Sequence, residues 1–216
     1  MPTLLLASAS PARRALLDAA GIDALVSVSG VDEDAVVADA RARFGEMEAG
    51  DVVLVLAHAK ASAIADALVE GDPALVPAEA PIGDLLVLGC DSVLELDGAV
   101  VGKPADAAEA RERWKTMRGR TGVLHTGHWL IDARDADRGG TGGTLGAASS
   151  TRVHFADITD AEIDAYVATG EPLAVAGAFT IDGLGGPFID GIDGDPHTVV
   201  GLSLPLLREL LREIGV

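Results

Sequence analysis

The 216-residue sequence has few aromatic residues and a single cysteine. Aromatic side chains make up only 3% of the chain, whereas Ala, Val, Leu and Gly dominate. This composition suits helices packed on a mostly parallel sheet better than an aromatic-rich β-sandwich. Because Cys90 has no second cysteine to pair with, an internal disulfide is excluded, and the chain is predicted to be cytoplasmic.

Positive charge is scarce as well. The 16 Lys and Arg residues are outnumbered by 34 Asp and Glu residues, which gives a formal net charge of −18 at pH 7. Such a chain repels nucleic acids and anionic membranes at long range, so we expect neither as a partner. A small phosphorylated ligand stays compatible with this charge, because a local group of arginines and lysines beside a metal ion can bind it.

Long apolar runs and familiar catalytic motifs are also missing. No run approaches the roughly 20 apolar residues of a membrane-spanning helix. The first eight residues lack the basic segment of a signal peptide and predict a first β-strand. There is no G-x-S-x-G, H-E-x-x-H or C-x-x-C motif, and the spacing in Gly98–Pro104 excludes a P-loop. His125 and His128 point to opposite faces of a predicted strand, so they cannot share a metal ion there.

What is present is an alternation of apolar strands and helices, which predicts one α/β (mixed α+β) domain over residues 1–216 with a mixed central sheet. The expected strands are 3–7, 25–28, 85–88, 93–96, 99–101, 121–131, 152–155 and 188–192. The expected helices are 11–20, 51–68, 105–118, 159–169 and 203–214. A glycine-rich insert at 133–150 is expected to form a flexible loop or the tip of a hairpin.

The segment from Ser8 to Arg14 is the first candidate site, because a strand ends there in two hydroxyls and a helix begins. Ser10 is a good N-cap, and Pro11 suits the first helical position. Backbone N–H groups and the positive end of the helix then point to one place, where Arg13 adds a charge-assisted donor. The pattern fits a phosphate chain, and it equally fits a capped helix with solvated arginines.

Two charged residues follow predicted strands. Asp91 comes after the buried run Leu85–Leu88, at the sheet edge where open α/β sheets usually bind ligands. A carboxylate there can hold Mg²⁺, take a proton from water, or simply cap a turn. Lys103 follows a hairpin whose turn is Asp97-Gly98, where it can neutralise charge on a leaving phosphate or remain a surface lysine.

Three further candidates are weaker when taken alone. The glycine-rich stretch Ala176–Gly186 permits close approach of the backbone to a flat ligand, and Asp182 can accept hydrogen bonds from the edge of a base. An ordinary turn would have the same composition. Glu33 and Lys60 lie in an acidic run and a helix, where charged side chains are usually solvated.

These segments, in this order, resemble the Maf family of nucleoside triphosphate pyrophosphatases over nearly the whole chain. The matching blocks are Leu-Ala-Ser-Ala-Ser-Pro-Ala-Arg-Arg at 6–14, Val-Asp-Glu-Asp at 31–34, Leu-Ala-His-Ala-Lys-Ala at 56–61, Gly-Cys-Asp-Ser at 89–92, Gly-Lys-Pro at 102–104, Gly-Glu-Pro-Leu-Ala-Val-Ala-Gly-Ala-Phe at 170–179, Ile-Asp-Gly at 192–194 and Val-Val-Gly-Leu-Ser-Leu-Pro at 199–205. The resemblance implies a two-lobed fold like that of inosine triphosphatase, with a cleft between the lobes.

The resemblance also implies a reaction, namely hydrolysis of the α–β phosphoanhydride of a nucleoside triphosphate, non-standard ones included. Asp91 matches the general base, and Glu33 matches the acidic residue that assists at the metal, so both are expected ligands of a divalent ion, Mg²⁺ or Mn²⁺. Lys60 and Lys103 match cationic phosphate contacts. The residues that match the phosphate-gripping loop are Ser8, Ser10 and Arg13. A homodimer is expected, because homodimers are common in the family.

Three positions that are expected to contact substrate depart from the family patterns. Members similar to the dTTP/UTP enzymes have Arg, Thr and Gln where this chain has Ala12, Ser92 and Asp182. Members similar to the 7-methyl-GTP enzymes have Trp, Gln and Glu there. Since neither set matches, the base is not assigned.

Two other functions are compatible with the sequence. One is a non-catalytic nucleotide-binding regulator of cell division, and the other is a metal-dependent phosphomonoesterase. Retention of Asp91, Glu33 and both lysines favours a catalyst over a regulator.

Overall fold

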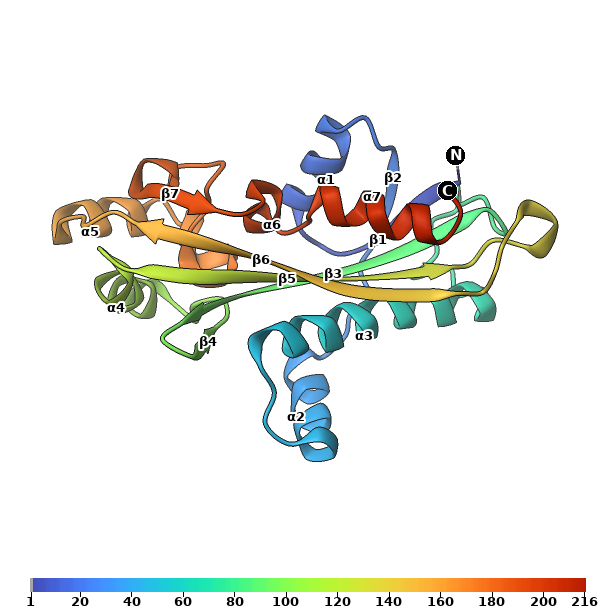
Figure 1. The fold of residues 1–216 in the computed structure, drawn as a ribbon, viewed down its shortest axis with the longest axis horizontal. Coiled ribbons are helices and arrows are strands. Elements are labelled where there is room, and N and C mark those ends of the chain that lie inside the picture. The colour runs from blue at the N-terminus through green and yellow to red at the C-terminus, as the bar shows by residue number, and fades with distance from the viewer. Residues whose placement is uncertain (1) are drawn as a thin grey trace.

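Strand β1 (Thr3–Ala7) is an almost fully buried apolar run between two parallel neighbours, β2 (Ala24–Ser27) and β3 (Leu85–Leu96). In this computed structural model, which describes residues 2–216, the three strands begin a seven-stranded mixed sheet (Figure 1). The other strands are β4 (Ala99–Val101), β5 (Thr121–Asp132), β6 (Thr144–Phe155) and β7 (Ile189–Asp193). The α-helices of the described residues are α1 (Pro11–Ala19), α2 (Glu33–Phe44), α3 (Ala49–Glu70), α4 (Ala107–Met117), α5 (Asp160–Ala168), α6 (Pro196–Val200) and α7 (Leu204–Glu213).

The sheet has the strand order β2-β1-β3-β5-β6-β7, and β4 pairs with β3. Only the two pairings of β1 are parallel, whereas β3 with β5, β5 with β6, and β6 with β7 are antiparallel. The mixed sheet of the predicted fold class is therefore confirmed. The expectation of a mostly parallel sheet, which rested on composition alone, is wrong.

Strand β3 is longer than the sequence indicated, because the two expected strands 85–88 and 93–96 are one continuous strand. Its first part pairs with β1, which ends where Ala7 lies opposite Gly89, and the rest continues along β5. Asp91 therefore lies inside a strand, two residues beyond the end of the parallel pairing, and the expected position at a strand end is wrong. The long partner β5 supplies the hydrogen bonds that extend β3 past this point.

Helices cover both faces of the sheet. Figure 1 shows α2 and α3 on one face and α1, α6 and α7 on the other. Helix α3 approaches the sheet closely at two glycines: a Cβ added at Gly89 would lie 2.1 Å from the Ala57 carbonyl oxygen, and one at Gly127 would lie 2.3 Å from that of Val53. By length and hydropathy α3 resembles a membrane-spanning helix, but it packs along the sheet and carries Lys60 in its middle.

Buried side chains form several groups, which lie in two regions along the long strands. One surrounds Trp114 on α4, whose ring makes edge-to-face contacts with Phe155, Tyr166 and Phe188. The other groups pack α1, α7 and α3 against β1 and the start of β3. Along β3, Cys90 belongs to the second region and Leu94 to the first, so Asp91 and Ser92 lie between them. This arrangement fits two lobes, and the predicted cleft between them stays a prediction.

The insert expected at 133–150 is wrong in its extent. Residues 144–150 form the first half of β6, where Gly146 lies beneath the ring of Trp129. Glycine is required at this position because the ring occupies the space that a side chain would take. The remaining loop is tied to Asp132, whose buried carboxylate accepts hydrogen bonds from Arg134 Nε at 2.7 Å and from the Thr141 hydroxyl at 2.9 Å.

Several local predictions are confirmed. Asp97 and Gly98 form the turn between β3 and β4 with φ values of 52° and 79°, as a tight hairpin turn requires. The Thr159 capping box starts α5, and Ser10 caps α1, with Pro11 in its first turn.

Candidate active site

Lys60 lies at the centre of a cluster of charges contributed by three elements. Its Nζ atom, in the middle of α3, is 2.5 Å from Asp91 Oδ1 on β3 and 2.7 Å from Glu33 Oε1 at the start of α2. The close approach of α3 at Gly89 brings Lys60, one turn after Ala57, onto the aspartate. The side chains of Lys60 and Asp91 are 12% and 9% exposed, whereas that of Glu33 is 52% exposed.

The environment of Asp91 favours a carboxylate that can accept a proton. Burial raises the pKa of Asp91, and the positive charges of Lys60 and Arg13 oppose this rise without cancelling it. A buried carboxylate with a raised pKa and a cationic partner is a typical general base. The thiol of the neighbouring Cys90 is not a candidate nucleophile, because burial raises its pKa to about 12.

The hydroxyls before α1 are arranged as donors. Ser8 Oγ accepts hydrogen bonds from Arg13 Nη1 at 2.9 Å and from the Ser10 N–H at 3.2 Å. These two bonds use both lone pairs of the oxygen, so its O–H is left to donate. Ser10 Oγ accepts from the Arg13 N–H as the helix cap, and its own O–H is free in the same way. Two hydroxyl donors at a helix N-terminus suit an anion such as phosphate.

Arg13 is buried, which neither sequence alternative anticipated. Its guanidinium donates to four oxygens, those of Gly201 O at 2.6 Å, Ser8 Oγ at 2.9 Å, Cys90 O at 2.9 Å and Ser92 Oγ at 3.0 Å. These bonds leave one of the five N–H groups of an arginine without a partner among the described residues. Arg13 therefore places a fixed positive charge beside Ser8, its remaining N–H is on Nη2, the nitrogen that donates to Ser92, and it is not a solvated arginine.

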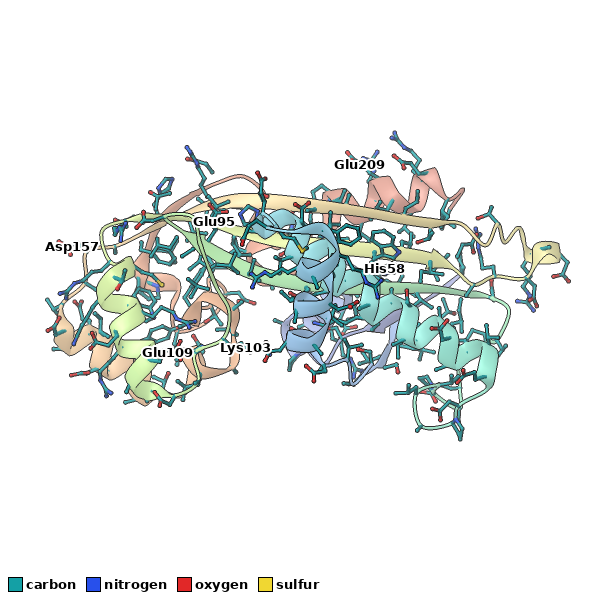
Figure 2. All side chains as sticks on the ribbon, turned by 90° about the horizontal axis from the view of Figure 1, so that it is seen from below. His58, Glu95, Lys103, Glu109, Asp157 and Glu209 are labelled. Atoms are coloured by element: carbon teal, nitrogen blue, oxygen red, sulfur yellow. The ribbon has the colours of Figure 1, made fainter. Side chains whose placement is uncertain are left out.

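Two of the expected site residues, Lys103 and Asp182, form no contact with this cluster in the described part of the chain. Lys103, between β4 and α4 and labelled in Figure 2, is exposed, and so is Asp182. Within residues 2–216 neither forms a hydrogen bond or an ion pair with the cluster around Lys60. The Gly102 carbonyl accepts a hydrogen bond from the Gly177 N–H at 3.1 Å, so the turn that carries Lys103 is tied to the glycine-rich stretch. Ala12, half-buried in the first turn of α1, makes no side-chain hydrogen bond.

Glu171 is a residue of this region to which the sequence pattern assigned no role. Its carboxylate organises the loop that carries Asp182. The donors to it are the Tyr166 hydroxyl at 2.9 Å, the Leu184 N–H at 3.0 Å, the Gly185 N–H at 3.1 Å and the Thr180 hydroxyl. The signal was present, because Glu171 lies in the Gly-Glu-Pro part of a recognised block.

The two histidines of β5 have separate surroundings, as the strand spacing predicted. His128 is fully buried and accepts a hydrogen bond from the Ser203 N–H at 2.8 Å. Burial, followed by the charge of Arg13, lowers the pKa of His128 to about 4, so the ring is neutral near pH 7. His125 instead contacts Ser150, 2.8 Å from its Nδ1.

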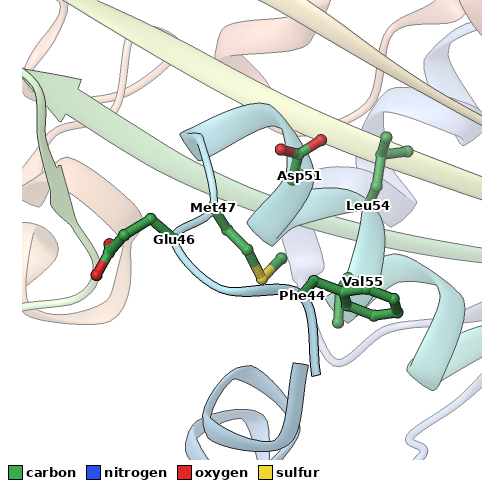
Figure 3. Close-up of a pocket in the computed structure, with 6 residues that line it drawn as sticks. All are labelled: Phe44, Glu46, Met47, Asp51, Leu54 and Val55. Atoms are coloured by element: carbon green, nitrogen blue, oxygen red, sulfur yellow. The ribbon is translucent and has the colours of Figure 1, made fainter. Parts of the chain in front are cut away.

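Two hollows on the surface lie elsewhere. Figure 3 shows one of about 300 Å³, lined by Phe44, Glu46, Met47, Asp51, Leu54 and Val55. A second, of about 410 Å³, shares Phe44, Leu54 and Val55 and extends to His58 and Trp129. The first lies at the C-terminal end of α2, and the second runs along α2 from Val36 to Phe44; no predicted site residue lines either hollow.

A divalent cation fits the acidic pair. Residues 2–216 contain no group of three His, Cys, Asp or Glu side chains that could hold a metal ion unaided. Glu33 and Asp91 nevertheless converge on one ammonium group, so their oxygens are close together. Mg²⁺ is usually bound by one or two carboxylates together with water and substrate phosphates, which is the donor set available here.

Known proteins are similar to this chain over nearly its whole length. The family model described as Maf-like protein matches residues 3–214. A nucleoside triphosphate pyrophosphatase of Salinispora tropica is 54% identical over 215 residues, which cover 99% of this chain and 84% of the relative. Proteins of the same name from Leifsonia xyli subsp. xyli and Streptomyces coelicolor are 54% and 52% identical, with 99% and 98% of this chain covered and 93% and 90% of the relatives. The chain belongs to the Maf-like protein family.

Proposed function

We propose that this chain hydrolyses nucleoside triphosphates at the α–β phosphoanhydride and releases a nucleoside monophosphate and pyrophosphate. Its similar relatives carry the name of this activity. The observation that supports the proposal most strongly is the buried Lys60–Asp91 pair, with Glu33 on the same ammonium. The segment before α1 adjoins this pair, since Arg13 donates to the carbonyl of Cys90, the residue directly before Asp91.

The residues divide the reaction between them. Asp91 takes a proton from a water molecule, whose oxygen attacks the α-phosphorus as the bond to the bridging oxygen breaks. Pyrophosphate leaves with the electron pair of that bond, and the proton is afterwards released from Asp91 to solvent. The Ser8 and Ser10 hydroxyls donate to phosphate oxygens, while Lys60, together with Lys103 from the other lobe, neutralises charge that develops on the leaving group.

We propose a divalent cation, Mg²⁺ or Mn²⁺, as the cofactor, with Glu33 and Asp91 as the protein ligands. When bound there it supplies positive charge to the phosphate oxygens. Glu33 is the more accessible of the two carboxylates, so it can turn from Lys60 toward the ion. Activity should disappear with EDTA and return on addition of either ion, whereas metal-independent turnover would contradict the assignment.

One assay separates the proposal from its alternatives. Purified protein is incubated with a panel of nucleoside triphosphates and Mg²⁺ or Mn²⁺, and the released anion is identified. Pyrophosphate supports the proposed reaction, and orthophosphate indicates a phosphomonoesterase. Binding without release of either anion indicates the regulatory role in cell division.

The assignment of the base has its own test. Asp91→Asn keeps the shape of the side chain but removes the proton acceptor, so turnover should fall by roughly a thousandfold or more while triphosphate binding persists. Asp190→Asn, at an exposed position of β7, is the matched control and should keep full activity. Substantial turnover by Asp91→Asn would assign the base to another residue. The homodimer and the cytoplasmic location stay predictions, and sedimentation of the purified chain tests the first.

A further inference from the structure

A chain of hydrogen bonds links Arg13 to helix α6 across two strands of the sheet. Arg13 Nη2 is 3.0 Å from Ser92 Oγ, which is 2.8 Å from Thr126 Oγ1. Thr126 Oγ1 is in turn 2.8 Å from the carbonyl oxygen of Thr198. Ser92 and Thr126 lie directly opposite each other on β3 and β5, so the sheet register holds the two hydroxyls together.

The chemistry of the two ends decides the direction of this chain. Arg13 can only donate, and the Thr198 carbonyl can only accept. Thr126 must therefore give its single hydrogen to Thr198 and accept one from Ser92. Ser92, in turn, gives its hydrogen to Thr126 and accepts one from Arg13. As long as the chain is intact, the Ser92 hydroxyl has no hydrogen left to donate to a bound base.

We infer that Ser92 and Thr126 are positioning residues for Arg13, and that the Ser92 hydroxyl does not donate to the base. The inference rests on the proposed function, because Arg13 matters through the phosphates that it helps to bind. It also gives Ser92 a different role from the one that the family pattern implies, which is selection of the substrate. A contact made through Arg13 acts on the phosphate chain, which all nucleoside triphosphates share.

Burial makes this arrangement costly to break. Thr126 and Thr198 are completely buried and Arg13 is 8% exposed, so a donor that loses its partner there is not rescued by water. The same guanidinium holds Ser8 Oγ through Nη1, and the Ser8 O–H is directed outward only while that bond exists. A displaced Arg13 therefore weakens two phosphate contacts together.

The test compares variants of two buried threonines. Thr126→Val removes the link between Ser92 and α6, and Thr126→Ser restores the hydroxyl. Thr151→Val is the matched control, because Thr151 is 1% exposed and donates to the Asp195 carbonyl directly before α6, at 2.9 Å, with no hydrogen bond to Ser92 or Arg13. Ser92→Ala breaks the same series of hydrogen bonds at a half-buried residue, so it replaces Thr126→Val in the test if Thr126→Val does not fold.

Kinetics over a panel of triphosphates measure the effect. Thr126→Val and Ser92→Ala should raise KM by about tenfold for every base, in line with the loss of one hydrogen bond to a charged group, and leave the ranking of bases unchanged. Thr126→Ser should recover the wild-type KM, and Thr151→Val should keep it. A changed ranking in Ser92→Ala, or an equal rise in KM for Thr151→Val, would overturn the inference.

Two measurements keep the inference separate from the proposed function. Binding of inorganic pyrophosphate, followed by calorimetry, should weaken by a similar factor in Thr126→Val and Ser92→Ala only. The ¹⁵N NMR signal of Arg13 Nε, identified by its loss in Arg13→Lys, should exchange with water faster in the same two variants. If the wild type releases no pyrophosphate, the proposed function fails, and unchanged Arg13 signals in Thr126→Val then decide against the positioning role by themselves.

Discussion

Lys60 Nζ lies 2.5 Å from Asp91 Oδ1, and both side chains are largely withdrawn from water. A buried pair of this kind is a poor source of stability, because removing two charges from water offsets much of their attraction. Its retention beside Glu33 and the hydroxyls of the α1 segment is therefore better explained by function. The pair is also assembled from distant parts of the chain, which makes it a sensitive reporter of the packing of α3 on the sheet.

Replacing Lys60 should change the pH dependence of turnover. Burial already raises the pKa of Asp91, and Lys60 is the strongest influence that opposes this rise. In Lys60→Met the pKa should rise further, so the acid limb of kcat/KM moves to higher pH, and kcat at neutral pH falls by roughly a hundredfold. Lys115→Met, which breaks only the exposed pair with Glu112, is the control. An acid limb at its original pH would contradict the role of Asp91 as base.

The close packing of α3 on the sheet should be intolerant of a single methyl group at Gly89. A Cβ there would lie 2.1 Å from the Ala57 carbonyl oxygen, so Gly89→Ala must displace α3. We expect a loss of about 3 kcal/mol in the free energy of unfolding and a fall in kcat as Lys60 moves off Asp91. Urea denaturation and steady-state kinetics measure both.

Gly50→Ala is the matched control for this change. Gly50 lies in the first turn of the same helix, with no atom within 4 Å of an added Cβ. The free energy of unfolding of Gly50→Ala should equal that of the wild type or be slightly higher, because alanine favours a helix. Equal stability of Gly89→Ala and Gly50→Ala would show that α3 can shift at no cost.

The loop between β5 and β6 should depend on Asp132. The pKa of the Asp132 carboxyl is held well below its usual range, mainly by hydrogen bonds from Arg134 and to a smaller extent by those from Thr141. Asp132→Asn leaves Arg134 without its counter-charge, which should cost about 3 kcal/mol near pH 7. A group with a lowered folded pKa stabilises above its unfolded pKa, roughly 4, and loses this contribution as the pH falls toward the folded value.

Thermal melting from pH 7 to pH 3 measures this effect. The gap in Tm between wild type and Asp132→Asn should narrow as the solution becomes acidic. Asp137→Asn, at an exposed position of the same loop, should have the same Tm as the wild type at every pH. If the difference in Tm between wild type and Asp132→Asn stayed constant from pH 7 to pH 3, the lost stability would come from altered packing of the side chain and not from its charge.

The exposed Asp182 should influence which base is preferred. An ionised carboxylate only accepts hydrogen bonds, whereas a glutamine both donates and accepts, so Asp182→Gln should change the ranking of triphosphates by kcat/KM. A change of about tenfold for at least one base is expected. Glu171 holds the loop in place in both proteins, so the fold of the loop should not differ. The same ranking over all common triphosphates would reject a role for Asp182 in base recognition.

Much of the local structure could be predicted from the sequence. The Asp97-Gly98 turn, the Thr159 capping box and the Ser10 cap involve residues at most a few positions apart, so their signals survive in any local window. The order of the sequence blocks likewise placed Asp91, Glu33 and Lys60 in one site, and the structure brings their side chains together. The lengths of β3 and β6 could not be predicted, because pairing with β5 extends both strands through segments with weak signals of their own.

The residue types alone establish the chemistry available to this protein: two carboxylates, two lysines, hydroxyls before a helix, and an arginine. How these groups are used depends on their neighbours in the folded chain. Arg13 is bonded to Ser92, 79 residues away, and to Gly201, 188 residues away, so no local pattern could show that its guanidinium is buried. Burial turned a plausible surface arginine into a fixed internal charge. Arg13 donates to both the Ser8 and the Ser92 hydroxyl, but the Ser8 O–H is left for a ligand, whereas the Ser92 O–H is used by Thr126. The physical reason is that a hydroxyl donates or accepts according to its neighbours in space, and sheet register and helix packing decide those neighbours.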